Sequence, residues 1–384
     1  MSRTAGTGAA SCTVAVVGAG AVGLLLACLL AQRGIPVLVF ERRSERARRA
    51  RAFGIHPPGL AALESAGVGP AVRQAAAFIR LGVASSGGRE LGTVSFGSRP
   101  ILSLPQDRTE AILQERLEQL APGALRRGVE VTGLRDDGDR VQLLAGDGAA
   151  QPLCTAVFAV GADGVRSTVR GFLGAEWLRR WGSGEYAMAD TRLPHDPGEV
   201  AVLRLERDGI VESFPLPGGV RRWAVRLPAR PESLASAEFA SIVEQRTAVR
   251  LDLGLLSAPS VFSARQHLAR PFARGRVALA GDAAHEISPI GGQGMNLGWL
   301  DALSLDKAIA EALAGPEHGA EPFARYAAQR AAAAARATRR AAFNMAMGAP
   351  LSRAGLLARN ALAHALAVPG VRGALASAFT MRGL

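Results

Sequence analysis

The stretch that decides the fold is Thr13-Val14-Ala15-Val16-Val17-Gly18-Ala19-Gly20-Ala21-Val22-Gly23. Its first five residues form an apolar, β-branched run, which is typical of a buried parallel strand. A glycine turn follows, and residues 24–33, apolar up to Ala31, indicate a helix that Gly34 ends. A second apolar strand, 36–40, leads to Glu41. Together these segments predict a complete βαβ unit.

Each glycine of the pattern Gly18-x-Gly20-x-x-Gly23 has a mechanical role in a dinucleotide-binding unit. The first makes the tight turn, the second lets the backbone approach a pyrophosphate, and the third packs the helix against the strand. The helix start offers free N–H groups to the phosphates, and Glu41 can accept hydrogen bonds from a ribose diol. A chain with 45 glycines can also form such a turn for structural reasons alone, but the flanking strands and Glu41 favour dinucleotide binding.

The amino-acid composition limits the domain number, the partners and the kinds of site that the chain can have. The 384 residues are 48% hydrophobic, enough for about two to three domains of core. The net charge is +12, yet the arginines are spread among acids and aromatics make up only 5%, so we expect a solvated surface and no nucleic-acid partner. Cys12, Cys28 and Cys154 lack CxxC spacing, which argues against a disulfide scaffold or a zinc site. With no secretory signal and no apolar run of about 20 residues, the sequence predicts a cytoplasmic protein.

The rest of the chain alternates between strands and helices. Residues 109–120 read as an amphipathic helix, and 129–160 and 183–230 read as strands separated by turns. A short buried strand, 276–280, runs into Gly281-Asp282, and the chain from residue 298 onward is mostly helical.

Three later motifs carry a resemblance to a known family. Residues 161–170 read GADGVRSTVR, residues 275–285 read GRVALAGDAAH, and residues 289–298 read PIGGQGMNLG. They resemble the later fingerprints of the class A FAD-dependent monooxygenases, the p-hydroxybenzoate hydroxylase-like family of aromatic hydroxylases. The resemblance spans roughly residues 13 to 310.

The resemblance implies an α/β fold, with a Rossmann-like FAD-binding domain, an interleaved β-sheet substrate domain and C-terminal helices. Residues 12–75, 100–180 and 265–345 would form the discontinuous FAD-binding domain. Residues 76–99 and 181–264 would form the substrate-binding sheet domain, and 346–384 the C-terminal helices. We expect this helical tail to pack on its own domain and not to contact a membrane.

The family pattern also implies how FAD is held, without a covalent bond. Arg51 and Arg108 match arginines that contact the flavin nucleotide, although each could be a surface arginine in so basic a chain. Asp282 resembles the carboxylate that accepts from the ribityl hydroxyls, and Asp163 a residue whose segment serves both FAD and the reduced nicotinamide. The implied cofactor-binding residues are Gly18, Gly20, Ala21, Val22, Gly23, Glu41, Arg42, Arg51, Arg108, Asp163, Gly281, Asp282, Pro289, Gly292, Gly294, Met295 and Asn296.

The implied activity is that of an NAD(P)H-consuming monooxygenase. Through a flavin C4a-hydroperoxide it would insert one atom of O2 into an electron-rich aromatic, quinolone or polyketide-type small molecule, with the flavin as the reactive group. Hydroxylation, epoxidation and Baeyer–Villiger oxidation all stay open. A flavin-dependent isoprenoid-type reductase and a non-catalytic flavin-binding scaffold are the alternatives. A flavin halogenase is disfavoured because Lys307, the only lysine, lies downstream of the Gly281-Asp282 motif.

Two further candidates have competing interpretations. His285 could transfer a proton, but its place in the Gly-Asp-Ala-Ala-His motif favours a structural role in orienting the loop. Phe214 could face the substrate or pack in the core. No histidines and carboxylates show metal-ligand spacing, so we expect no metal.

Overall fold

The predicted βαβ unit is confirmed in the computed structural model, which describes residues 10–46, 52–146, 152–288, 292–315 and 321–366. Strand β1 (Ala10–Val17) leads into helix α1 (Ala21–Gln32), and β2 (Val37–Glu41) returns parallel to β1, with Val14 opposite Val37. Helix α1 is apolar on almost every side, since it is enclosed by its sheet and by two further helices.

The first sheet is built around this unit. Its strand order is β19-β20-β11-β1-β2-β8, and the hairpin β9–β10 is joined to β11. Strands β20, β11, β1, β2 and β8 run parallel, so the turns that follow them lie at one edge of the sheet. The bounds are β8 (Leu125–Arg127), β9 (Gly133–Asp136), β10 (Val141–Leu144), β11 (Pro152–Gly161), β19 (Ala273–Arg274) and β20 (Val277–Leu279).

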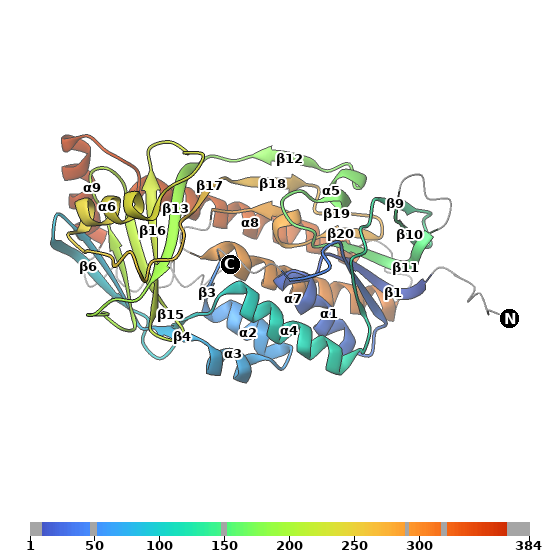
Figure 1. The fold of residues 1–384 in the computed structure, drawn as a ribbon. Helices are drawn as coiled ribbons and strands as arrows, with labels where there is room; N and C mark the ends of the chain where they lie inside the picture. The colour runs from blue at the N-terminus through green and yellow to red at the C-terminus, as the bar shows by residue number, and fades with distance from the viewer. Residues whose placement is uncertain (1–9, 47–51, 147–151, 289–291, 316–320, 367–384) are drawn as a thin grey trace.

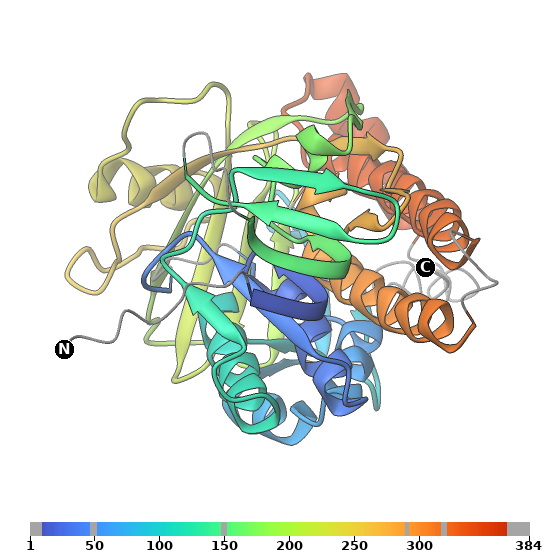
Figure 2. The ribbon, with the colours of Figure 1, turned by 90° about the vertical axis from the view of Figure 1, so that its right-hand side faces the viewer.

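Helices cover this sheet. Helix α1 packs between α4 (Gln106–Leu120) and α7 (Gln293–Ala314), and α8 (Glu321–Met347) packs on α7 (Figure 2). Helices α2 (Pro57–Ser65) and α3 (Gly69–Ala75) extend the layer, while the short α5 (Thr168–Phe172) and the 3-10 turn η1 (Gly281–Ala283) follow β11 and β20.

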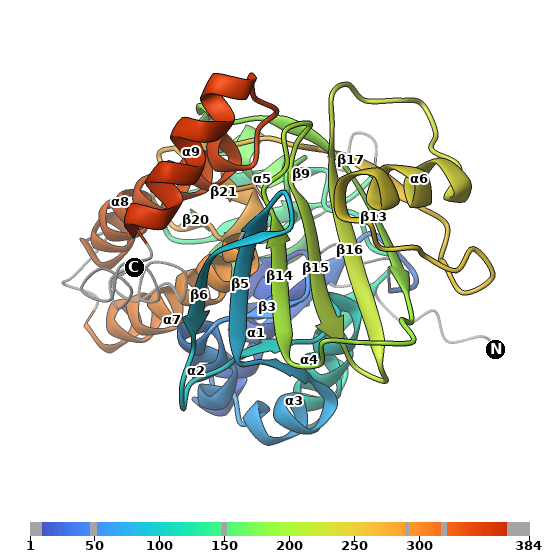
Figure 3. The ribbon, with the colours of Figure 1, turned by 90° about the vertical axis from the view of Figure 1, so that its left-hand side faces the viewer.

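The second sheet has seven strands in the order β17-β13-β16-β15-β14-β5-β6 and lies at the other end of the molecule (Figure 1). One face packs on α6 (Ser236–Thr247), and the other is partly covered by the end of α8 and by α9 (Arg353–Leu366) (Figure 3). The strands are β5 (Leu81–Ser86), β6 (Arg89–Ser95), β13 (Gly184–Thr191), β14 (Val200–Arg204), β15 (Val211–Leu216), β16 (Val220–Leu227) and β17 (Ser260–Ala264).

Two small sheets complete the architecture. One holds β12 (Glu176–Arg179), β18 (His267–Arg270) and β21 (His285–Glu286), and the other β3 (Gly54–Ile55), β7 (Ile101–Ser103) and β4 (Ala77–Ile79). The α/β fold with an interleaved sheet and C-terminal helices is therefore as the sequence predicts. No helix among the described residues has the length and apolar character needed to span a bilayer.

Candidate functional site

In the glycine turn between β1 and α1, Gly18 and Gly23 are packed tightly against backbone atoms and Gly20 is not. Gly18 has φ +107°, and a Cβ there would lie 2.3 Å from the carbonyl oxygen of Ala162. A Cβ on Gly23 would lie 2.0 Å from the Gly18 carbonyl oxygen. A Cβ on Gly20 would meet only a Glu110 oxygen, at 3.8 Å. The turn therefore leaves room beside Gly20, at the N-terminus of α1, where a pyrophosphate would fit.

The first residues of α1 are held by contacts with three other segments. Val22 packs against Gly281 and Gly298, since a Cβ on either glycine would come within 3.0 Å of its side chain. The Ala21 N–H donates to Glu110 Oε1 at 3.2 Å, and Gln106 Nε2 donates to the same oxygen at 2.8 Å. Burial raises the pKa of Glu110, although these hydrogen bonds partly oppose the effect.

Glu41 lies at the end of β2, as the sequence predicts. Its Oε2 accepts from the Ala19 N–H at 2.9 Å and its Oε1 from the Arg43 N–H at 3.0 Å. Each carboxylate oxygen has a second lone pair, so both can still accept from ribose hydroxyls.

Of the three arginines predicted to contact FAD, the structure describes Arg42 and Arg108. Arg42 lies 3.8 Å from Glu130 in an exposed ion pair. Arg108 is exposed and lines a cavity of about 200 Å³ at the junction with the second sheet, beside Leu216 and Val220. Arg51, like Pro289, lies outside the described residues.

The turn after β11 is fixed by its own motif. Asp163 accepts from Ser167 Oγ at 2.5 Å and from the Thr168 N–H at 2.7 Å, and so holds the start of α5, whose N-cap is Ser167. Arg170 donates to the carbonyl of Ala283 at 3.1 Å, and its guanidinium carbon lies 3.8 Å from the centre of the Trp177 ring. Arg170 therefore links the 161–170 motif to the Gly281-Asp282 motif, a role that was not predicted.

A buried network holds the Gly281-Asp282 turn on α7. Asp301 accepts from the Gly281 N–H at 3.0 Å and from Arg330 Nε at 2.6 Å, and it lies 2.5 Å from His285 Nε2. Burial alone would raise the pKa of Asp301, but the charges of His285 and Arg330 and their hydrogen bonds lower it below its ordinary value. This geometry supports a loop-orienting role for His285.

Asp282, next to this network, is exposed to solvent although many protein atoms surround it. This partial desolvation raises the pKa of Asp282, Glu286 adds to the effect, and His285 opposes it. Asp282 lies at the same edge of the sheet as Gly18 and Glu41, because β1, β2 and β20 belong to one parallel array.

The start of α7 is clamped to β3 by Asn296. Its Nδ2 donates to the carbonyls of Gly54 (2.8 Å) and Gly292 (2.7 Å), and its Oδ1 accepts from the His56 N–H at 2.8 Å. The side chain is thus engaged. What this helix start can offer a ligand is the backbone N–H groups of its first turn, among them those of Gly294 and Met295, which have no acceptor within the helix.

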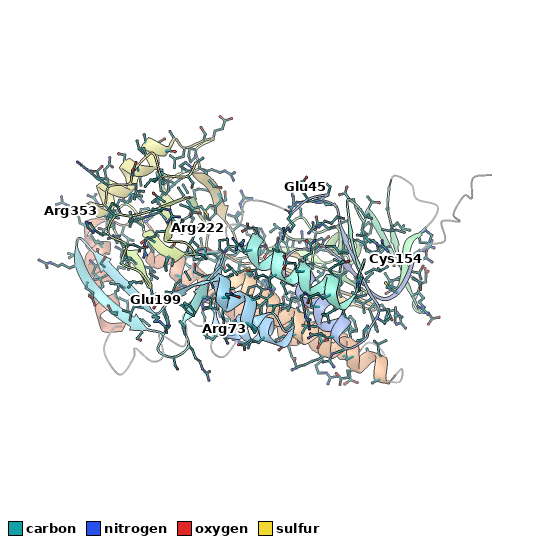
Figure 4. The ribbon with its side chains drawn as sticks, turned by 60° about the horizontal axis from the view of Figure 1, so that its bottom comes forward. Glu45, Arg73, Cys154, Glu199, Arg222 and Arg353 are labelled. Atoms are coloured by element: carbon teal, nitrogen blue, oxygen red, sulfur yellow. The ribbon has the colours of Figure 1, made fainter. Side chains whose placement is uncertain are left out.

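The second sheet meets the first domain beside this clamp. The rings of Phe53 and Phe214 lie 5.1 Å apart, and the Arg222 guanidinium lies 5.4 Å from the Phe53 ring centre. Arg222 is held by two 2.8 Å bonds to Asp190, and Figure 4 shows it on the side of the sheet domain nearer the first domain. No cluster of metal-ligating side chains occurs in the parts of the chain that the structure describes.

These residues fit FAD. The open space beside Gly20, the carboxylates of Glu41 and Asp282, and the helix starts of α1 and α7 supply what a pyrophosphate, a ribose, a ribityl chain and an isoalloxazine ring need.

Comparisons with known proteins agree with this fit. A family model described as an FAD binding domain matches residues 11–341. Anhydrotetracycline monooxygenase of Streptomyces rimosus is 33% identical over 323 residues, covering 79% of this chain. The match covers 63% of that relative, so the chain spans less than two thirds of its length.

Two solved structures show the same fold. The anhydrotetracycline hydroxylase from Streptomyces rimosus has a TM-score of 0.76 at 31% identity, covering 97% of this chain and 76% of that chain. The p-nitrophenol 4-monooxygenase from Pseudomonas putida has a TM-score of 0.85 at 23% identity, covering 98% and 100%. The three motifs, the fold and the family model agree, and the chain belongs to the FAD binding domain family of the p-hydroxybenzoate hydroxylase-like class A flavoproteins, with FAD as its cofactor.

Proposed function

We propose that this protein is an FAD-dependent, NAD(P)H-consuming monooxygenase that inserts one oxygen atom into an electron-rich aromatic or polyketide-type small molecule. When bound, FAD supplies the redox chemistry, taking electrons from NAD(P)H and activating O2. The names of two relatives, an anhydrotetracycline monooxygenase and an anhydrotetracycline hydroxylase, support this activity.

The observation that carries the proposal is the position of the α7 start. Asn296 ties it to Gly54, and the neighbouring Phe53 contacts Phe214 on the second sheet. A flavin ring bound at the α7 N-terminus would therefore face the sheet face that includes Phe214. In this arrangement the backbone N–H groups of Gly294 and Met295 would stabilise negative charge on the ring, and the sheet would orient the substrate and exclude water.

We also propose the predicted site residues as FAD contacts, with Gln106 and Glu110 as neighbours of the pyrophosphate. NAD(P)H as electron donor points to the cytoplasm, and the free thiols of Cys12, Cys28 and Cys154 agree with a reducing compartment.

The test is turnover in 18O2 with aromatic and quinonoid compounds that stimulate NAD(P)H oxidation. One labelled oxygen atom in the product, and the other in water, is the expected result. Product formed equally fast without oxygen would favour the reductase alternative. Tight FAD binding with no stimulated oxygen uptake across the panel would favour the scaffold.

A further inference from the structure

Glu212 is a buried carboxylate that nothing in the FAD site uses. It lies on β15, in the middle of the seven-stranded sheet, opposite Leu203 on β14 and Ala224 on β16. Only 3% of the residue is exposed. It forms no hydrogen bond or ion pair with any residue that the structure describes.

The other charged groups on this face are engaged elsewhere. Arg222 pairs with Asp190, and Arg226 donates to the Tyr186 hydroxyl at 3.0 Å and to the Met345 carbonyl of α8 at 3.2 Å. Arg359 of α9 donates to the backbone carbonyls of Leu205, Glu206 and Met347.

Arg204 of β14 does not pair with Glu212 either, because its guanidinium stacks over Trp223 on the opposite face of the sheet. Burial raises the pKa of the nearby Tyr186 hydroxyl to about 12, and the charge of Glu212 adds to this shift while Arg226 opposes it.

An unpaired buried carboxylate is costly to keep, so its retention calls for a partner that arrives with a ligand. Burial raises the pKa of Glu212 to about 7. The group can therefore exist as a carboxylate or as a carboxylic acid near neutral pH, which is what a proton acceptor requires.

The strand register places Glu212 close to the residue of this sheet that contacts the first domain. Phe214 lies two residues further along β15, on the same face and about 7 Å away along the strand. Phe214 contacts Phe53, which precedes the Gly54 held by Asn296. Glu212 therefore lies on the same sheet face as Phe214, the residue through which this sheet contacts Phe53 beside the Asn296 clamp.

We propose that Glu212 binds the hydroxyl group of a phenolic substrate and accepts its proton. The phenol O–H bond breaks, an O–H bond forms on the carboxylate, and the electron pair stays on the phenolate oxygen, so the ring becomes more electron-rich without any net redox change. This inference rests on the proposed monooxygenase function and narrows its substrates to phenols.

The experiment measures binding to the oxidised, FAD-loaded enzyme without NAD(P)H, through changes in flavin absorbance. The probes are 1-naphthol, 2-naphthol and 4-methylphenol, which stay neutral over this range, each beside its methyl ether, at pH 6 and pH 8. The variants are Glu212→Gln, which keeps the shape, and Glu90→Gln, which makes the same charge change at an exposed position of the same sheet.

At pH 8 the wild type and Glu90→Gln should bind at least one phenol roughly tenfold or more tightly than its ether, as loss of a charged hydrogen bond predicts. The preference should shrink at pH 6 and vanish in Glu212→Gln. Equal binding of phenol and ether, a preference that survives in Glu212→Gln, or no binding of any phenol would overturn the inference.

Oxygen uptake separates this outcome from failure of the proposed function. NAD(P)H-dependent oxygen uptake stimulated by aromatic compounds, without phenol preference, would leave the function intact and remove the role of Glu212. Absence of both FAD retention and oxygen uptake would remove the function and the inference together.

Discussion

At the scale of single residues, the three glycines of the first turn differ in what a methyl group would meet. A Cβ on Gly18 or Gly23 would meet backbone atoms at 2.3 or 2.0 Å, whereas one on Gly20 would meet only a Glu110 oxygen, at 3.8 Å. Gly20 also has φ −78°, which any L-residue can adopt. Gly18 and Gly23 therefore build the turn, and Gly20 keeps the anion site accessible.

We expect Gly20→Ala to fold but to bind FAD weakly. The methyl group enters the space proposed for the pyrophosphate, so the FAD dissociation constant should rise at least about tenfold, while the unfolding free energy of the apoprotein changes by less than about 1 kcal/mol. FAD fluorescence quenching and urea unfolding measure the two effects. Gly171→Ala, also in open space, is the control, and unaltered FAD affinity in Gly20→Ala would contradict the proposed cradle.

A second prediction for a single residue concerns the effect of Glu212 on the pH dependence of the unfolding free energy. Its pKa in the folded state is about 7, above its ordinary value of 4.5, so ionisation destabilises the fold as pH rises between these values. Glu212→Gln should match the wild type near pH 4.5 and exceed its unfolding free energy by about 3 kcal/mol at pH 8. Urea unfolding at several pH values checks this, with Glu90→Gln expected to show no such trend. A loss of stability at pH 8 would mean that the carboxylate has a favourable partner.

At the scale of elements, helix α7 organises the site because its first turns hold two other segments. Asn296 fixes β3, and Asp301 fixes the Gly281 turn and pairs with Arg330 of α8. Asp301→Asn leaves the buried Arg330 without its counter-charge, so we expect a loss of about 3–5 kcal/mol in unfolding free energy and weaker FAD binding.

Asp306→Asn on the same helix is the control, since its partner Arg33 is 45% exposed and such pairs contribute about 1 kcal/mol or less. Thermal and urea unfolding of both variants give the comparison. If Asp301→Asn were no more destabilising than Asp306→Asn, the network would not anchor the turn. Because the folded-state pKa of Asp301 is lowered, its stabilising effect should disappear as pH falls through that pKa.

The elements also show what the sequence could and could not predict. The βαβ unit was predictable because an apolar strand, a glycine turn and an apolar helix are local patterns. Helix α4 begins at Gln106, three residues before the predicted start, and this changes which residue faces α1. Gln106 and Glu110 share a helix face at i and i+4, whereas Arg108, about 200° around the helix from Gln106, points to the domain junction.

Contacts between distant segments were not predictable in this way. The Phe53–Phe214 contact and the Asp301–Arg330 pair join residues far apart in the chain, and no local periodicity encodes them. From the sequence alone, Glu212 likewise looks like an ordinary strand residue. Only the strand register shows that its neighbours are Leu203 and Ala224.

At the scale of the whole molecule, FAD joins parts of the chain that are otherwise separate. The proposed contacts come from the turns after β1, β2 and β20 and from the start of α7, which lie at one edge of the first sheet. A ligand that binds only when these turns are assembled stabilises the folded state by mass action.

Free FAD at about one hundred times its dissociation constant should therefore add about 2.7 kcal/mol to the unfolding free energy and raise Tm. The cofactor should come off intact on denaturation, since the proposed contacts are non-covalent. Thermal unfolding with and without FAD, and chromatography of the released flavin, test both points. FMN has no ADP half to fill the space beside Gly20, so it should stabilise the protein less than FAD, and Gly20→Ala should narrow that difference. Equal stabilisation by FMN and FAD would show that the glycine turn does not bind the pyrophosphate.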